Sequence, residues 1–172
     1  AFKGNSMTIV AGSSWQPDED LFIEYFNTHP DIKLIIAPHV IDENHLVEII
    51  SKLKRPYVRY SKANEQNVRN ADCLIIDGFG LLSSIYRYGE IAYVGGGFGV
   101  GIHNILEAAV YGIPVIFGPK YQKFMEAKQL LEENGAFSIK NYEELSQLLD
   151  KMISDTEYLK EVGANADNYV SK

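Results

Sequence analysis

Short apolar runs alternate along this chain with longer segments of mixed polarity. The apolar runs have the length of buried strands, and the segments between them carry apolar residues every three or four positions, as helices do. The predicted strands fall at residues 7–11, 34–37, 57–59, 73–76, 91–94, 115–117 and 137–139. Predicted helices begin at Pro17 and after Gly101, and occupy 43–54, 81–87, 124–133, 142–153 and the segment from 156 onward. This alternation predicts the α/β class, a parallel sheet with helices on both faces.

The segment from Ile91 to Pro119 is the most distinctive part of the pattern. It reads as a buried strand, a turn with five glycines between 95 and 101, one helix and a second buried strand. Apolar residues at helical spacing give this helix a core stripe, formed by Ile102, Ile105, Leu106, Ala109 and Val110. We therefore expect His103, Asn104 and Glu107 on a different face, near the start of the helix.

A glycine stands where such a helix ordinarily has a Ser, Thr, Asp or Asn cap. The first backbone N–H groups would then be left to water or to an anion, and the partial positive charge at that end favours phosphate. The alternative is that the glycines only let the strand bend into the helix, with Glu107 as an ordinary first-turn carboxylate. Neither G-x-G-x-x-G nor G-x-x-x-x-G-K-[ST] matches, which excludes a dinucleotide fingerprint and a P-loop.

Polar or glycine-rich turns follow five of the predicted strands. They contain Ser13-Ser14, His39, the run Gly78, Phe79 and Gly80, the glycines from 95 to 101, and Gly118-Pro119-Lys120. Ligands bind at the carboxyl ends of the strands in parallel sheets, so we expect these turns to line one cleft. Plainer roles stay open: the serines can cap the first helix, His39 can be a surface residue, and Phe79 can fill the core instead of stacking on a base.

The composition is that of a globular domain. With 46% hydrophobic and 23% charged residues, residues 1–172 are expected to form a single domain with its own core. A net charge of −7 without a Lys/Arg cluster argues against binding to nucleic acid.

No apolar run reaches the roughly 18 residues of a membrane span, and no signal peptide precedes the first strand. Cys73, the only cysteine, fits a buried strand in a reducing compartment, and the early first strand leads us to expect a fragment.

Catalytic signatures are mostly absent. The four histidines lack metal-ligand spacing and the chain has no G-x-S-x-G elbow, so we expect no metal, no cofactor and no catalytic residue here. Glu107 is interpreted as an acceptor for ribose hydroxyls rather than as a general base. These observations favour a chain that holds a nucleotide without carrying the full chemistry.

The stretch GGGFGVGIHNILEAAVYGIPVIFGP, from Gly95 to Pro119, closely resembles the donor-binding half of the 3-deoxy-D-manno-octulosonic acid (Kdo) transferases. In that family a glycine-rich turn is followed by G-x-H-N-x-L-E-x-A and by an apolar strand ending in GP. The resemblance extends to the Ser13-Ser14 turn, Pro38, the turn 77–80 and the segment 85–89. It therefore covers most of the chain.

The resemblance implies a Rossmann-like three-layer α/β/α domain, the C-terminal half of a GT-B glycosyltransferase, with the N-terminal acceptor domain absent from this chain. It implies CMP-Kdo as the donor, a lipid A precursor as the acceptor and inversion at the sugar carbon. The general base and the acceptor surface would belong to the missing half. The fragment would be soluble and inactive, whereas the full-length enzyme would act at the cytoplasmic face of the bacterial inner membrane.

The resemblance also implies how a donor would be held. Gly97, Gly101, His103 and Asn104 would face the phosphate and the Kdo carboxylate, Glu107 the ribose, and Phe79 and Gly80 the cytosine. Donors at the helix end would stabilise the charge that grows on the departing CMP, without a required metal. Ser13, Ser14, His39 and Gly78 complete the predicted donor site.

The chain departs from the family's pattern at two places. The family commonly has a His and then a Gly-Glu-Glu run after the first strand, where this chain has Trp15 and then residues 17–19, and it has an Arg in place of His39. A neutral imidazole cannot replace the planar guanidinium fork, so donor preference is open to change. Two rival functions remain: the donor domain of a UDP-sugar GT-B enzyme, and a non-catalytic nucleotide-sensing module.

Overall fold

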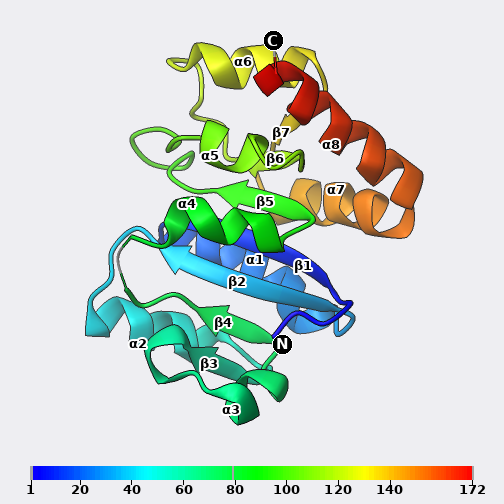
Figure 1. The fold of residues 1–172 in the computed structure, drawn as a ribbon. Coiled ribbons are helices and arrows are strands. Elements are labelled where there is room, and N and C mark those ends of the chain that lie inside the picture. Colours follow the sequence, from blue (N-terminus) through cyan, green and yellow to red (C-terminus); the bar gives the residue numbers. More distant parts are fainter. Residues whose placement is uncertain (1, 79, 172) are drawn as a thin grey trace.

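A computed structural model describes residues 2–78 and 80–171, which are built around one sheet (Figure 1). The sheet has seven parallel strands in the order β3-β4-β2-β1-β5-β6-β7. The strands are β1 (Met7–Ser14), β2 (Ile32–Pro38), β3 (Tyr57–Arg59), β4 (Cys73–Ile75), β5 (Ile91–Val94), β6 (Val115–Phe117) and β7 (Ala136–Ser138). The predicted parallel sheet is confirmed, with a strand at each predicted position.

Helices connect the strands and cover both faces of the sheet (Figure 1). The longer ones are α1 (Gln16–Thr28), α2 (Glu43–Lys52), α6 (Met125–Glu132), α7 (Tyr142–Ser154) and α8 (Thr156–Ser171). The shorter ones are α3 (Glu65–Arg69), α4 (Leu82–Ile85), α5 (Leu106–Ala109) and the 3₁₀ turns η1 (Tyr60–Lys62) and η2 (Tyr86–Tyr88). The predicted Rossmann-like three-layer arrangement is confirmed.

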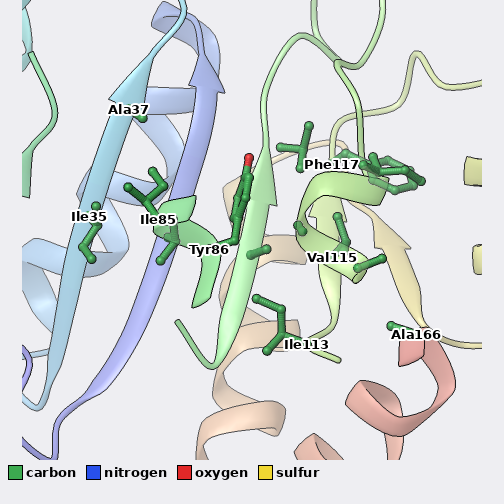
Figure 2. Close-up of a cluster of buried hydrophobic side chains, with 14 of the residues drawn as sticks. Ile35, Ala37, Ile85, Tyr86, Ile113, Val115, Phe117 and Ala166 are labelled. Atoms are coloured by element: carbon green, nitrogen blue, oxygen red, sulfur yellow. The ribbon is translucent and has the colours of Figure 1, made fainter. Parts of the chain in front are cut away.

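Each face of the sheet has its own hydrophobic core, because successive side chains of a strand point to opposite faces. In β1, Val10 belongs to one core, whereas Ile9 and Ala11 belong to the other. Figure 2 shows part of the first core, where Ile85, at the end of α4, lies near Ile35 of β2. The second core is covered by α1, α2 and α7. Both faces are therefore buried, as the apolar character of the strands requires.

The predicted helix after the glycine turn is wrong in its start and its length. Residues 101–105 are irregular, and α5 spans only Leu106–Ala109. The backbone amides predicted to be free instead donate to main-chain carbonyls 3.1–3.2 Å away, in the pairs Gly101 to Gly96, Ile102 to Lys120 and His103 to Gly95. Val110, predicted for the core, is 52% exposed. The glycine turn itself and the turn after β6 thus accept the donors that an isolated helix would leave unpaired.

The other elements differ from their predicted bounds by a few residues. The first strand continues to Ser14 instead of ending at Ala11. The helix predicted at 81–87 is α4 followed by η2, and α3 lies in a polar segment for which no element was predicted. Cys73 is buried in β4, and burial raises the pKa of its thiol. Within the described ranges, the structure contains no helix of the length and apolar character that crossing a bilayer requires.

Candidate functional site

The turns at the carboxyl ends of β2, β1, β5 and β6 lie side by side, because these strands are neighbours in the sheet. Hydrogen bonds join the turns to one another. The His39 amide donates to the Ser14 carbonyl at 2.9 Å, and the Lys120 amide donates to the Gly97 carbonyl at 2.9 Å. The strand order changes direction between β1 and β5, and open α/β sheets bind ligands outside such a point. This edge of the sheet is the candidate site.

The glycines after β5 allow neighbouring turns to pack backbone against backbone. A Cβ on Gly95 would lie 2.2 Å from the carbonyl oxygen of Ser13, and a Cβ on Gly97 would lie 2.6 Å from the Cα of Gly118. Neither position accepts a side chain unless a neighbouring turn moves. Gly101 has a φ of 141°, in the left-handed region that favours glycine. Contacts within the protein therefore account for these glycines before any ligand is considered.

The two serines at the end of β1 are buried. Ser13 has a φ of 54°, a left-handed conformation that is uncommon outside glycine. The Ser14 hydroxyl donates to Glu19 Oε2 at 2.8 Å. The side chain of Ser14 is thus engaged inside the protein, at the start of α1.

Asp18 is fully buried and ties three parts of the site together. Its carboxylate accepts hydrogen bonds from the Tyr93 hydroxyl at 2.7 Å, from the Trp15 amide at 2.9 Å and from the Gly96 amide at 3.2 Å. Burial raises the pKa of this carboxyl, and the hydrogen bonds oppose burial only in part. Asp18 therefore fixes the glycine turn to the start of α1 and to β5.

Glu19, also fully buried, joins α1 to α2 through His45. His45 Nε2 lies 2.8 Å from Glu19 Oε1, and His45 Nδ1 lies 2.7 Å from the carbonyl oxygen of Val40. When Glu19 is ionised both partners are acceptors, so both ring nitrogens carry protons. Burial alone would lower the pKa of His45, but its hydrogen bonds outweigh burial and raise that pKa. Burial raises the pKa of Glu19 as well, so the pair retains its shared proton to higher pH than a free histidine would.

We expect His45→Gln to lower the free energy of unfolding by about 1–2 kcal/mol in mildly acidic solution, because a hydrogen bond to a charged partner is lost. The raised pKa of His45 means that its protonation stabilises the fold fully below pH 6.5, the unfolded value, and that this contribution disappears as the pH rises through the folded value. The difference between wild type and variant, measured by urea unfolding across a pH series, should therefore shrink with rising pH. His29→Gln is the control, since its carboxylate partner is exposed and 3.4 Å away. A difference that grows with pH would contradict this reasoning.

Three aromatic rings from three different turns gather at the site. Trp15 Nε1 donates a hydrogen bond to His103 Nε2 at 3.1 Å, and the two ring planes are within 11° of each other. The His39 ring stacks on both, with its centroid 4.4 Å from that of Trp15 and 4.6 Å from that of His103. We call these three residues the ring cluster. Trp15 and His39, the two departures from the Kdo transferase pattern, are thus in contact with each other.

The remaining predicted residues are spread around this edge. Asn104 is exposed, and its Oδ1 accepts the Leu106 amide at 2.9 Å, which leaves the amide NH₂ group to donate elsewhere. Glu107 is partly buried in α5. Gly78 and Gly80 follow β4, which is separated from β1 by β2, and a Cβ on either would meet no atom within 4 Å. Phe79 lies outside the described residues.

Two hollows flank the segment from Gly96 to Leu106. The first, of about 270 Å³, is lined by residues that include Trp15, Phe98 and Val100. The second, of about 470 Å³, is lined by residues that include His103, Asn104 and Phe124. The hydrogen bond between Trp15 and His103 connects their walls. In the described part of the chain, no three His, Cys, Asp or Glu side chains are grouped as metal ligands would be.

Sequence reasoning missed the buried carboxylates and the ring cluster. Asp18 falls in the first turn of the helix predicted from Pro17, where a carboxylate is ordinary, and the sequence predicts no role for His45. One signal for Asp18 was present: it stands three residues after Trp15, the spacing at which a carboxylate reaches back to the amide that precedes a helix. For the ring cluster no local signal exists, because its members belong to turns that meet only in the folded sheet.

No model of a known protein family matches this chain. Among curated proteins, the chain is 35% identical over 158 residues to the 3-deoxy-D-manno-octulosonic acid transferase of Aquifex aeolicus, which covers 88% of this chain and 43% of that protein. It is 28% identical over 165 residues to the bifunctional glycosyltransferase/methyltransferase of Fusobacterium nucleatum, covering 94% of this chain and 26% of that protein. The chain spans less than half the length of either relative.

Two solved structures show the same fold. The C-terminal CMP-Kdo binding domain of WaaA from Acinetobacter baumannii matches with a TM-score of 0.85 and 21% identity, over 99% of this chain and 92% of that one. Anabaena HepE, solved in complex with UDP-glucose, matches with a TM-score of 0.69 and 17% identity, over 97% of this chain and 44% of that one. At these identities the likeness concerns the fold alone.

Proposed function

We infer the function of this chain from the premise that it is a homologue of the Kdo transferases with the Rossmann-like fold of a GT-B glycosyltransferase. We propose that it binds the nucleotide-sugar donor CMP-Kdo for a glycosyltransferase that transfers Kdo. The observation that carries the proposal is the 35% identity with the Aquifex aeolicus enzyme across 88% of the chain. The turns that would hold the donor lie at the sheet edge where folds of this class bind ligands.

In the proposed complex, the phosphate and the Kdo carboxylate lie beside the segment from Gly96 to Leu106. His103 and Asn104 line the hollow there. The backbone of Lys120 lies at the same edge, where its carbonyl accepts the Ile102 amide at 3.2 Å, and in the proposed complex its ammonium group faces the phosphate. Because the amides at 101–103 are bonded within the protein, side chains supply most of the stabilisation of charge on the departing CMP. Glu107 accepts hydrogen bonds from the ribose.

We further propose the reaction that this donor site serves. A hydroxyl of a lipid A precursor attacks the anomeric carbon of Kdo, the bond to CMP breaks, and the configuration inverts. The base that takes the hydroxyl proton and the acceptor surface belong to the part of the enzyme outside this chain, at the cytoplasmic face of the bacterial inner membrane. Phe79 and Gly80 contact the cytosine, and no metal is required. The chain alone then binds donor and transfers nothing.

The proposal predicts which amides respond to nucleotide in a two-dimensional NMR titration of the ¹⁵N-labelled chain. With CMP, we expect the largest shifts at Gly80 and Leu81 and between Gly95 and Glu107. The amides of α7, which packs on α1 and α8 and contains none of the predicted donor-binding residues, serve as the internal control. A response of Gly95–Glu107 to NAD alone would contradict the proposal, and so would a chain that transfers Kdo without a second domain.

A UDP-sugar donor is the rival that the fold favours, because Anabaena HepE was solved with UDP-glucose and shares this fold. Tighter binding of UMP than of CMP in the same titration would support it. The second rival is a nucleotide-sensing module without catalysis. It would bind nucleotide and would belong to a protein that has no second Rossmann-like domain. The complete coding sequence distinguishes that rival from both enzymes.

A further inference from the structure

The ring cluster is assembled from three neighbouring strands. Trp15 follows β1, His39 follows β2, and His103 lies in the segment after β5. The His39 ring covers the other two rings, and its backbone is fixed by the bond between its amide and the Ser14 carbonyl. The rings of Trp15 and His103 are thereby held nearly parallel, with Trp15 Nε1 3.1 Å from His103 Nε2.

The hydrogen bond between Trp15 and His103 determines where the imidazole carries its proton. An indole N–H group is a donor only, so His103 Nε2, 3.1 Å from it, accepts and carries no proton. A neutral imidazole has a single proton, which then lies on Nδ1. Without this bond, the proton is free to move to Nε2.

The surroundings of His103 keep its ring neutral. Burial lowers the pKa of His103, the adjacent His39 lowers it further, and Asp18 opposes both. His39 faces the ring from the turn after β2 and Asp18 from α1, and Glu126 of α6 lines the same hollow as His103. The bond from Trp15 acts in the same direction as burial, because a proton on Nε2 would point at the indole N–H.

The Nδ1 atom lies on the side of the ring that is turned away from the glycine turn. The opposite Cδ2 atom faces Gly96, where a Cβ would lie 2.9 Å from it. Nδ1 has no hydrogen-bond partner among the described residues. Every buried polar side-chain atom of these residues does have a partner, so Nδ1 is not buried and is open to solvent. His103 lines the hollow that it shares with Asn104 and Phe124. An N–H donor at Nδ1 is thus available to a ligand.

We propose that Trp15 is a positioning residue that holds His103 as the Nδ1–H tautomer, so that the ring donates a hydrogen bond to an anionic group of a nucleotide at this edge. The inference rests on the proposed donor-binding function. With the proton on Nε2, Nδ1 would present a lone pair to a phosphate oxygen and repel it. Trp15 therefore determines whether His103 attracts or repels the anion, without contacting the ligand itself.

The ¹⁵N resonances of the imidazoles in the ligand-free chain report the tautomer directly. In the wild type we expect a protonated Nδ1, an unprotonated Nε2 and a scalar coupling across the hydrogen bond from Trp15 to His103. Trp15→Phe keeps a ring against His39 but removes the donor, so Nε2 should gain proton population. His39→Phe keeps both the stacked ring and the donor, and should leave the tautomer unchanged. A protonated Nε2 in the wild type, or the lack of the coupling, overturns the proposal even if Trp15→Phe fails to fold.

The affinity for CMP tests whether Trp15 acts through His103. Trp15→Phe should weaken CMP binding about tenfold, and His103→Ala by at least as much. In the His103→Ala background, Trp15→Phe should have little further effect. An equal loss from Trp15→Phe with and without His103 overturns the proposal. If the wild type binds no CMP, the donor-binding function fails and the ligand half of this inference fails with it, while the tautomer result still decides whether Trp15 positions His103.

Discussion

Asp18→Ala is expected to lower the free energy of unfolding by about 3–5 kcal/mol. The carboxylate is fully buried and is the acceptor for three donors, the Tyr93 hydroxyl and the backbone amides of Trp15 and Gly96. Alanine leaves these donors without a partner inside the protein, and each unsatisfied buried donor costs about 1–3 kcal/mol. The substitution also removes the cost of burying the carboxyl, a cost that is reflected in its raised pKa, and this offsets part of the loss. Urea unfolding measures the change.

Two further variants separate the role of Asp18 from a general effect of charge. Asp20→Ala removes a neighbouring carboxylate whose partner, Lys52, lies 2.6 Å away at the surface, and should cost less than about 1 kcal/mol. Tyr93→Phe removes one of the three donors and should cost about 1 kcal/mol. If Asp18→Ala costs no more than Asp20→Ala, Asp18 does not hold the turns together as described.

Gly95→Ala is expected to lower the free energy of unfolding by at least about 3 kcal/mol. A Cβ there would lie 2.2 Å from the Ser13 carbonyl oxygen and 2.6 Å from the Ser14 Cα. These are backbone atoms at the end of β1, so no side-chain rotation relieves the clash. The Gly95 amide also donates to the Gly12 carbonyl at 2.9 Å, and moving the turn would break that bond. The midpoint of urea unfolding, or the soluble yield if the variant is too unstable, is the measurement.

Gly99→Ala is the matched control within the same turn. Gly99 is exposed, and a methyl group added to it would have its nearest neighbouring atom 3.8 Å away, an ordinary contact. The stability of this variant should stay within about 0.5 kcal/mol of the wild type. Equal losses of stability at Gly95 and Gly99 would contradict this reasoning. They would mean that something other than close backbone packing makes the turn intolerant of both substitutions.

Strand positions and the parallel sheet followed from the sequence because they depend on short apolar runs that are buried on both faces. The helix predicted at 102–110 was wrong, although Ile102, Ile105 and Ala109 are buried as its periodicity required. Burial on one side does not reveal how the backbone is bonded. Carbonyl groups of the glycine turn itself and of the turn after β6 accept the amides at 101–103, so the chain stays irregular until Leu106.

The candidate site was predictable in its location but not in its internal contacts. Sheet order brought the turns together because every strand is parallel and its carboxyl end lies at one edge. The contacts of Asp18 with Tyr93, and of Trp15 with His103, join positions far apart in the chain. A polar residue in a first helical turn and a single exposed aromatic both have ordinary local explanations, so neither indicates such a partner.

The central place of β1 in the sheet also determines the order in which this domain can fold. The Thr8 amide bonds to Glu90, 82 residues further along the chain, and β5 is the strand that covers this edge of β1. Closing so long a loop is slow, because its entropic cost comes before the contacts that reward it. During synthesis one edge of β1 therefore stays unpaired until β5 has emerged, and an unpaired strand edge is a template for aggregation. The ring cluster and the glycine turn form only when that edge closes, which makes the site a late product of folding.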